Sequence, residues 1–256
     1  MTEQPGGPLA LNYTQPSWSE RRRVFVRERN RFNFATWLDR LVALYGDRTA
    51  FALDRPIEYP GFSGDVLSYK DVGRLVNRMA HAMRALGVRS GDRVGMITVN
   101  RIEMAFVNFA AGKIGAVPVP MNFMLRPSEI DYIMRRSGAE LLVCDRTVLD
   151  NTIRNVADLP AVKRLAMIGE EDVPEPCISM RDLMAEAPDF LEPTLPESDD
   201  EVALLFFTSG TTGFPKGAVL THSAAMVGVR NHGRAYALLP RLKPQLSLLV
   251  MPVAHA

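Results

Sequence analysis

Apolar residues recur at steps of three and four over residues 69–86, and this spacing predicts an amphipathic helix. The apolar face consists of Val72, Leu75, Val76, Met79, Met83 and Leu86. Ser68 and Asp71 have the spacing of a capping box, and Gly87 follows the last apolar position as a helix stop. His81 lies beside the apolar face, where a structural histidine is expected rather than a catalytic one.

Short apolar runs alternate with further helical patterns in the next part of the chain. The runs DRVGMITV, AVPVPMN, AELLVCD and VKRLAMIG predict strands or extended segments. Helices are predicted between them, over 102–114 with Asn100 and Glu103 as caps, from Pro127 to Gly138, and near 147–157. Strands that alternate with helices indicate βαβ units. The fold class predicted is α/β, with mostly parallel sheets flanked by helices.

The composition changes between Gly169 and Glu201, where there are twelve acidic residues, five prolines, one arginine and no lysine. This pattern predicts an acidic, solvated connector with one helix, SMRDLMAEA, inside it. A specific docking role for the acidic residues is the less favoured alternative. The run EVALLFFTSG then predicts a strand that leads directly into a polar loop.

The overall composition is that of a soluble globular protein, with 47% hydrophobic and 23% charged residues. A net charge of +1 gives no reason to expect a nucleic-acid partner. Two cysteines, Cys144 and Cys177, make no disulfide framework, so a cytoplasmic location is expected, with Cys144 as a core residue. No apolar run is long enough for a transmembrane helix. Peripheral membrane contact stays an open alternative, and the sequence assigns no oligomeric state.

The N-terminus contains no secretory signal pattern, and residues 1–30 are expected to be flexible because they are rich in proline, glycine and polar residues. The basic run RRRVFVRERNR lies at the end of this segment. A solvated amphipathic segment is favoured there over a patch that binds lipid or nucleic acid.

The segment FFTSGTTGFPKG, residues 206–217, is the strongest functional signal. It combines hydroxyl residues, glycines and a lysine directly after an apolar strand. A strand, a glycine-rich loop and a following helix would form a cradle for phosphate groups, because loop amides, hydroxyls and the helix dipole can all face an anion. The alternative is a plain surface turn. The spacing is not that of a Walker A loop, since Gly217 rather than a hydroxyl residue follows Lys216, and it is not G-x-G-x-x-G.

FFTSGTTGFPKGAVLTH resembles the signature of the adenylate-forming superfamily, which includes acyl-CoA synthetases, fatty acyl-AMP ligases, luciferases and the adenylation domains of peptide synthetases. Three other segments are similar to blocks of this family in the same order: LSYKDVGRLVNRMAHAMRALGVRSGDRVGMITVN, AAGKIGAVPVPMNFMLRPSEIDYIMRRSGAELLVCD and VMPVAHA. The resemblance covers about residues 35 to 256 and is strongest to the N-terminal portion of an acyl-CoA synthetase, or fatty-acid–CoA ligase.

The resemblance also implies a domain organisation. Residues 31–256 would form an incomplete large N-terminal AMP-binding domain, with a first lobe over about 66–200 and a second lobe from about 31–65 plus 201–256. The small C-terminal domain of the family would be absent.

The activity implied by the resemblance is that of an ATP-dependent acid–thiol ligase. A carboxylate, here expected to be a fatty acid of unreadable chain length, attacks the α-phosphate of ATP and pyrophosphate leaves. A thiol, usually that of coenzyme A, then displaces AMP from the acyl-adenylate. Mg²⁺ is expected with ATP, although no ligand for it can be named in this chain.

Site residues follow by position in the family's motif. The β- and γ-phosphates of ATP are assigned to Thr208, Ser209, Gly210, Thr211, Thr212, Gly213 and Lys216. His255 matches a histidine that borders the acyl pocket, so it is expected to position the substrate. Thr221 and His222 are expected to begin the next helix. No catalytic residue is expected here, because the family's catalytic lysine would lie beyond Ala256.

Several alternatives remain open at this point. No YGxTE-like run and no TGD occur in the chain, so later blocks of the family have no counterpart. The chain is either part of a ligase or a truncated, non-catalytic remnant that binds nucleotide, and little ligase activity is expected from it alone. A fatty acyl-AMP ligase is the alternative within the ligase class. An unrelated kinase is disfavoured by the missing Walker hydroxyl.

Overall fold

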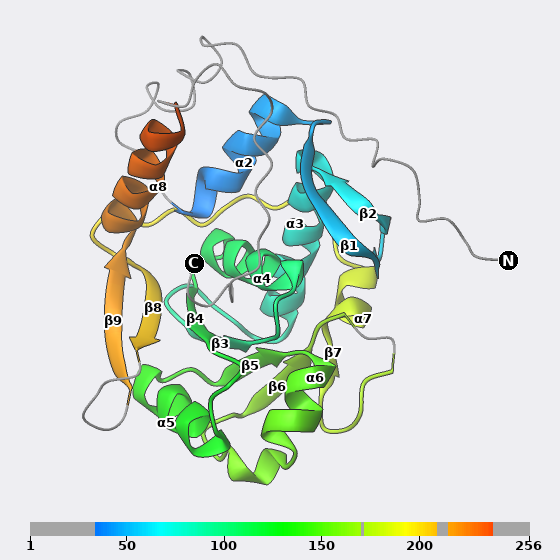
Figure 1. The fold of residues 1–256 in the computed structure, drawn as a ribbon, viewed down its shortest axis with the longest axis vertical. Helices are drawn as coiled ribbons and strands as arrows, with labels where there is room; N and C mark the ends of the chain where they lie inside the picture. The colour runs from blue at the N-terminus through cyan, green and yellow to red at the C-terminus, as the bar shows by residue number, and fades with distance from the viewer. Residues whose placement is uncertain (1–33, 170–171, 209–214, 238–256) are drawn as a thin grey trace, which may run out of the picture.

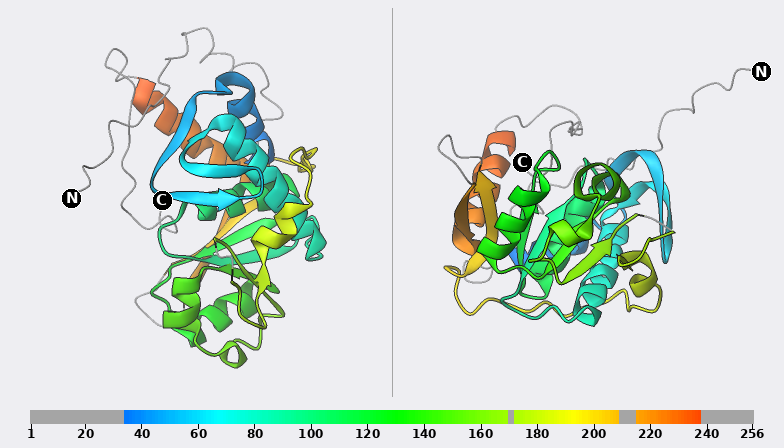
Figure 2. Two further views of the ribbon diagram at one scale, coloured as in Figure 1. Left: turned by 90° about the vertical axis from the view of Figure 1, so that its right-hand side faces the viewer. Right: turned by 90° about the horizontal axis from the view of Figure 1, so that it is seen from below.

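The computed structural model describes residues 34–169, 172–208 and 215–237. Its main sheet has five parallel strands, in the spatial order β4 (Val117–Met121), β3 (Arg93–Ile97), β5 (Leu141–Cys144), β6 (Arg164–Met167) and β7 (Ile178–Ser179). Two antiparallel hairpins accompany it, β1 (Thr49–Tyr59) with β2 (Phe62–Ser68), and β8 (Val202–Thr208) with β9 (Lys216–Thr221). The hairpins lie on opposite sides of the molecule, as both Figure 1 and the right-hand view of Figure 2 show. The predicted parallel sheet is confirmed.

Helices cover both faces of this sheet. The helices of the described residues are α2 (Phe34–Tyr45), α3 (Tyr69–Ala85), α4 (Ile102–Lys113), α5 (Pro127–Ser137), α6 (Arg146–Val148), α7 (Met180–Ala185) and α8 (His222–Ala237). Of these, α8 packs on the β8–β9 hairpin and on α2. Successive side chains of β5 point to opposite faces, as the strand period requires. Leu141 and Val143 pack with α3 and α4 on one face, and Leu142 and Cys144 pack with α5 on the other. The described residues therefore build a three-layer α/β/α arrangement around two apolar cores.

The ends of the helices follow local sequence signals in most cases. The capping box of α3 is confirmed, because the Asp71 amide donates to Ser68 Oγ at 3.1 Å and the Ser68 amide donates to the Asp71 carboxylate at 3.0 Å. Gly87 follows α3 with a φ of 83°, and Gly138 follows α5 with a φ of 70°, both in the left-handed region that favours glycine. Pro127 is the first residue of α5, as predicted.

Two local predictions are wrong. Asn100 does not cap α4; Arg101 precedes the helix without a side-chain cap, and Glu103 is buried in an ion pair with Arg101 instead. The single helix near 147–157 is divided into α6, a π-helical turn at Leu149–Ile153 and a 3₁₀ turn at Val156–Asp158. Arg154 separates the two turns with a φ of 53°, and the Asn155 side chain accepts the Ala157 amide, so local hydrogen bonds replace the continuing helix.

The predicted connector contributes more to the fold than its composition suggested. Its predicted helix is confirmed as α7, but the segment also supplies β7, one of the two edge strands of the main sheet. Side chains of α3 hold the stretch after α7. Asn77 donates to the backbone oxygen of Asp189 at 2.8 Å, and a ring nitrogen of His81 lies 2.9 Å from the backbone oxygen of Phe190. His81 thus has the structural role that was predicted.

Gly95, in the central strand β3, provides a test of the core packing. A Cβ atom built there would overlap Met134 Sδ and would lie 3.1 Å from Met121 Cε. We expect Gly95→Val to lower the free energy of unfolding by about 1–3 kcal/mol, because the added carbons overpack a filled core. Gly228→Val in α8, where an added Cβ atom would have no described atom within 4 Å beyond its own helix backbone and chain neighbours, should change it by less than about 0.5 kcal/mol. Urea unfolding of both variants gives the comparison, and equal midpoints would contradict this packing.

Candidate functional site: the β8–β9 hairpin

The polar loop of the sequence connects two antiparallel strands. Thr208, the last residue of β8, pairs with Lys216, the first residue of β9. Among the predicted ATP-binding residues, these two lie within the described part of the chain, and the structure brings them together at one end of the hairpin. Residues 209–213 and His255, which were predicted to bind phosphate and substrate, lie outside the described residues.

The loop end of the hairpin presents a positive charge that no described carboxylate compensates. Thr208 and Lys216 are both exposed, and the Thr208 hydroxyl donates to the backbone oxygen of Lys216 at 3.5 Å. Pro215, directly before Lys216, is buried and fixes the start of β9. No carboxylate among the residues that the structure describes pairs with the Lys216 ammonium group. The lysine is therefore available to an anionic ligand.

The base of the hairpin is anchored to the main sheet. β8 lies against β4, the sheet's edge strand, and Leu205 and Phe207 pack on the apolar core beside α5. A Cβ atom at Gly217 would lie 3.2 Å from Cζ of Phe207, so the glycine leaves space for the phenyl ring across the strand pair. This packing holds the two strands, and hence Thr208 and Lys216, on a rigid support.

The expectation that a helix directly follows the loop is wrong. β9 comes first, and α8 begins only at His222. The six residues of β9 span about 20 Å. The N-terminus of α8 therefore lies at the other end of the hairpin, where the His222 amide donates to the backbone oxygen of Glu201. The helix dipole cannot act on a ligand in the loop, because its effect falls off within about one helical turn. Loop amides, hydroxyls and Lys216 remain as the donors.

Thr221 directly precedes α8 and His222 is its first residue, so the helix starts where it was predicted. The Ala224 amide donates to the Thr221 hydroxyl at 3.3 Å, which satisfies one of the unpaired donors of the first turn. Burial lowers the pKa of His222, and the carboxylates of Glu201 and Asp199 partly oppose that shift. A buried imidazole at this position is neutral near pH 7, in keeping with a structural role.

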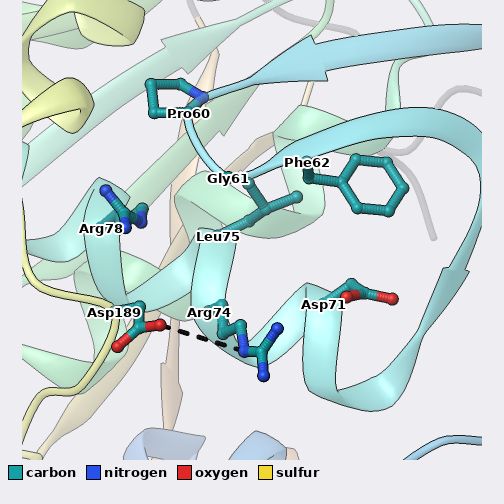
Figure 3. Close-up of a pocket in the computed structure, with 8 residues that line it drawn as sticks. All are labelled: Pro60, Gly61, Phe62, Asp71, Arg74, Leu75, Arg78 and Asp189. Carbon is teal, nitrogen blue, oxygen red and sulfur yellow. Dashed lines mark ion pairs between the residues drawn. The ribbon is translucent and has the colours of Figure 1, made fainter.

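A pocket of about 60 Å³ lies beside the other hairpin, away from the loop. Figure 3 shows its lining residues, which are Pro60, Gly61, Phe62, Asp71, Arg74, Leu75, Arg78 and Asp189. Its arginines are already engaged with the segment after α7. Arg74 Nε lies 3.9 Å from a carboxylate oxygen of Asp189, and Arg78 donates to two backbone oxygens at the end of α7. These contacts hold the segment after α7 against α3, and the pocket lies where the two meet.

Three buried charged groups were not predicted from the sequence. Glu103 pairs with Arg101 at 2.8 Å and accepts a hydrogen bond from the Tyr59 hydroxyl at 3.3 Å. Burial, together with the charge of Glu103, raises the pKa of Tyr59. Asp145 is fully buried and accepts the amides of Val99 and Val148, while Lys113 is buried between helices. Each group has at least one partner that is distant in sequence, which is Tyr59 for Glu103, Val99 for Asp145 and Asp39 for Lys113, and spacing along the chain gives no signal for such a partner.

The remaining predictions concern cysteines, metals and membranes. Both cysteines are unpaired; Cys144 is a buried core residue, as predicted, and burial raises the pKa of its thiol. The described residues contain no cluster of three or more His, Cys, Asp or Glu side chains that could hold a metal ion. The donors at the hairpin, a hydroxyl and an ammonium group, suit phosphate oxygens rather than Mg²⁺. In the part of the chain that the structure describes, no helix has the length and apolar character needed to cross a membrane.

Comparisons with known proteins agree with this arrangement. A family model described as "AMP-binding enzyme" matches residues 38–256. Feruloyl-CoA synthase from an Amycolatopsis species is 39% identical over 160 residues, which are 62% of this chain and 29% of that protein. Long-chain-fatty-acid–CoA ligase FadD13 from Mycobacterium tuberculosis is 33% identical over 186 residues, which are 68% of this chain and 35% of that protein.

A solved structure supports the same relationship. The anthranilate CoA ligase AuaEII, in complex with anthranoyl-AMP, superposes with a TM-score of 0.69 at 27% identity, over 79% of this chain and 37% of that one. The chain spans about a third of the length of the curated relatives it matches, and the shared part is their N-terminal portion. The predicted fold class is confirmed. The chain belongs to the AMP-binding enzyme family and, within it, to the AMP-forming acid–CoA ligases.

Proposed function

We propose that this chain supplies the polyphosphate-binding hairpin of an ATP-dependent ligase that joins a carboxylic acid to the thiol of coenzyme A. The observation that carries the proposal is the arrangement of residues at the loop end of the β8–β9 hairpin. There Lys216, an exposed lysine that pairs with no carboxylate among the described residues, stands opposite Thr208, and residues 209–215 between them are rich in glycine and hydroxyl side chains in the sequence. Membership of the AMP-forming ligases supports ATP and coenzyme A as its substrates.

The donors at the hairpin have a clear role in the reaction of the carboxylate with ATP. A carboxylate oxygen forms a bond to the α-phosphorus of ATP, and the bond from that phosphorus to the bridging oxygen of the β-phosphate breaks. Negative charge then builds on the departing pyrophosphate. Fixed amides, hydroxyls and the Lys216 ammonium group would stabilise that charge most in the transition state, which lowers the barrier. The thiol of coenzyme A next bonds to the acyl carbon, and AMP leaves.

The remaining parts of the proposal concern substrate, ion and location. A fatty acid is the proposed carboxylate, and the similarity to FadD13 supports it, while the similarity to a feruloyl-CoA synthase makes an aromatic acid the competing choice. Mg²⁺ would neutralise part of the charge of the ATP phosphates, and no residue described here is assigned to it. A cytoplasmic location is proposed on the basis of the two unpaired cysteines.

Titration calorimetry of this chain with a phosphate series tests the proposal. We expect affinity to decrease in the order ATP, ADP, AMP, and inorganic tripolyphosphate to compete with ATP, because the hairpin offers donors to the phosphate chain. AMP binding as tightly as ATP would contradict the assignment. Exchange of pyrophosphate into ATP, measured with a fatty acid and with a hydroxycinnamic acid, then asks which carboxylate is activated.

A further inference from the structure

The pocket of about 60 Å³ beside the β1–β2 hairpin has room for a small ligand. One water molecule needs roughly 10–15 Å³ of such space, so a ligand of about five heavy atoms fits. Two arginines of α3, Arg74 and Arg78, line the pocket together with the turn at Pro60 and Gly61. The arginines are four residues apart, so they lie on one face of α3, and Figure 3 shows them together with this turn.

The contacts with the segment after α7 do not use the whole guanidinium group of Arg78. Among the described residues, its partners are the backbone oxygens of Met184 and Ala185, and both are bound through Nη1. The Nε and Nη2 atoms lie beside the turn instead, since a Cβ atom built at Gly61 would be 3.9 Å from each of them. Arg78 therefore has N–H groups available at the pocket.

Arg74 is held by a weak interaction. Its Nε atom lies 3.9 Å from Asp189 Oδ2, which is beyond hydrogen-bond distance. The two side chains are 57% and 54% exposed, so water screens the attraction between them. In the part of the chain that the structure describes, Arg74 has no closer acceptor. An anion in the pocket would meet little competition for this guanidinium group.

The rest of the lining favours an anion as well. Asp71 is already used, because its carboxylate accepts the amide of Ser68 at 3.0 Å and the hydroxyl of Ser68 at 2.6 Å in the capping box of α3. Leu75 is 1% exposed and Phe62 adds an aromatic ring, so part of the lining is apolar. Hydrogen bonds to a charged group are stronger beside apolar walls, where the local dielectric constant is lower than in water.

We propose that this pocket binds one small tetrahedral oxyanion, phosphate or sulfate, between Arg74 and Arg78. A guanidinium group presents its donors in a planar fork, and a tetrahedral oxyanion has enough oxygen atoms to accept from two forks at once. The chain of a polyphosphate is too large for the pocket. The β1–β2 and β8–β9 hairpins lie on opposite sides of the molecule, so this site is independent of the proposed function.

An NMR titration of the whole ¹⁵N-labelled chain with inorganic phosphate, with chloride keeping the ionic strength constant, tests the site. We expect saturable shift changes at the amides of Gly61, Arg74 and Arg78, with a dissociation constant of about 1–10 mM. Sulfate should compete, whereas acetate and tripolyphosphate should compete about tenfold less, because neither can bond to both arginines inside the pocket. The absence of a saturable change at these amides, or equal competition by tripolyphosphate, would overturn the proposal.

Arg74→Gln separates binding from folding, because its one weak pair contributes little to the fold. The variant should raise the dissociation constant for phosphate about tenfold, as expected for a lost hydrogen bond to a charged group. Arg84→Gln is the matched control: Arg84 also lies on α3 and contacts the same segment, at Thr194, but does not line the pocket. Unchanged binding by Arg74→Gln would refute the site. An equal loss in Arg84→Gln would also refute it, since only the net charge would then matter.

Urea unfolding gives an independent readout. Phosphate stabilises many proteins because it is excluded from their surface, so the comparison is made between variants rather than between salts. Phosphate should raise the unfolding midpoint of the original chain and of Arg84→Gln more than that of Arg74→Gln, because a ligand stabilises only the state that binds it. Equal rises in all three proteins would show general exclusion alone and contradict a specific site.

Discussion

Lys216→Ala is expected to weaken ATP binding by about 10-fold to 100-fold, which corresponds to the roughly 1.5–3 kcal/mol of a hydrogen bond to a charged group. Lys216 is exposed and no described carboxylate pairs with it, so its removal should not disturb the fold. Titration calorimetry with ATP measures the loss, and urea unfolding checks that the stability is unchanged. Thr211→Ala and Thr212→Ala, added to Lys216→Ala, should weaken binding further.

Lys163→Ala is the control for this experiment. Lys163 is 65% exposed and pairs with Glu140 at the start of β5, so its loss changes the net charge by the same amount away from the hairpin. It should leave ATP affinity within about twofold, because exposed charges more than a Debye length apart are largely screened. Equal effects of the two alanine variants would mean that the lysine acts only through the overall charge, and would refute the assignment of Lys216.

Arg101→Ala should have the largest effect on stability. The side chain of Glu103 is 2% exposed and its carboxylate lies 2.8 Å from Arg101. Without Arg101, a buried carboxylate keeps mainly the Tyr59 hydroxyl as a neutral partner, and the expected loss is about 3–5 kcal/mol in the free energy of unfolding. Urea unfolding followed by circular dichroism measures this loss.

Arg126→Ala is the matched control, because Arg126 also pairs with a glutamate, Glu129, but its own side chain is 79% exposed. A surface pair of this kind should contribute little to the stability, because solvent screens its charges. The double variant Arg101→Ala with Glu103→Leu should recover part of the loss, since an apolar side chain suits the buried position. A loss for Arg101→Ala no greater than that for Arg126→Ala would show that Glu103 is not buried as described.

The fold of the first part of the chain could be predicted because local signals agree with the tertiary structure. The capping residues Ser68 and Asp71 mark the start of α3, and the strand period of two in β5 distributes its side chains between two cores. The failures have a different origin. Glu103 was predicted as a helix cap from its spacing to Asn100, whereas Tyr59, which is distant in sequence, packs against it and leaves its carboxylate buried.

The sequence predicted which residues belong to the candidate site, but it did not predict their spatial arrangement. The residue types between Thr208 and Lys216 indicate phosphate chemistry, and the structure places these two residues opposite each other. The strand after the loop was missed because KGAVLT is short and leads directly into the helix signal of Thr221 and His222. Pairing between β8 and β9 fixes that strand, and such pairing depends on contacts across the hairpin rather than on local propensity.

The account depends on the segment from Thr208 to Gly217 as a binding site for the phosphate chain of ATP. Its most direct test is a titration of ¹⁵N-labelled chain with inorganic tripolyphosphate, followed by amide chemical shifts in NMR spectra. The account predicts that the largest shift changes lie between Thr208 and Gly217 and that Lys216→Ala reduces them. Changes centred elsewhere, for example on the pocket at Arg74 and Arg78, or no saturable change at all, would contradict it.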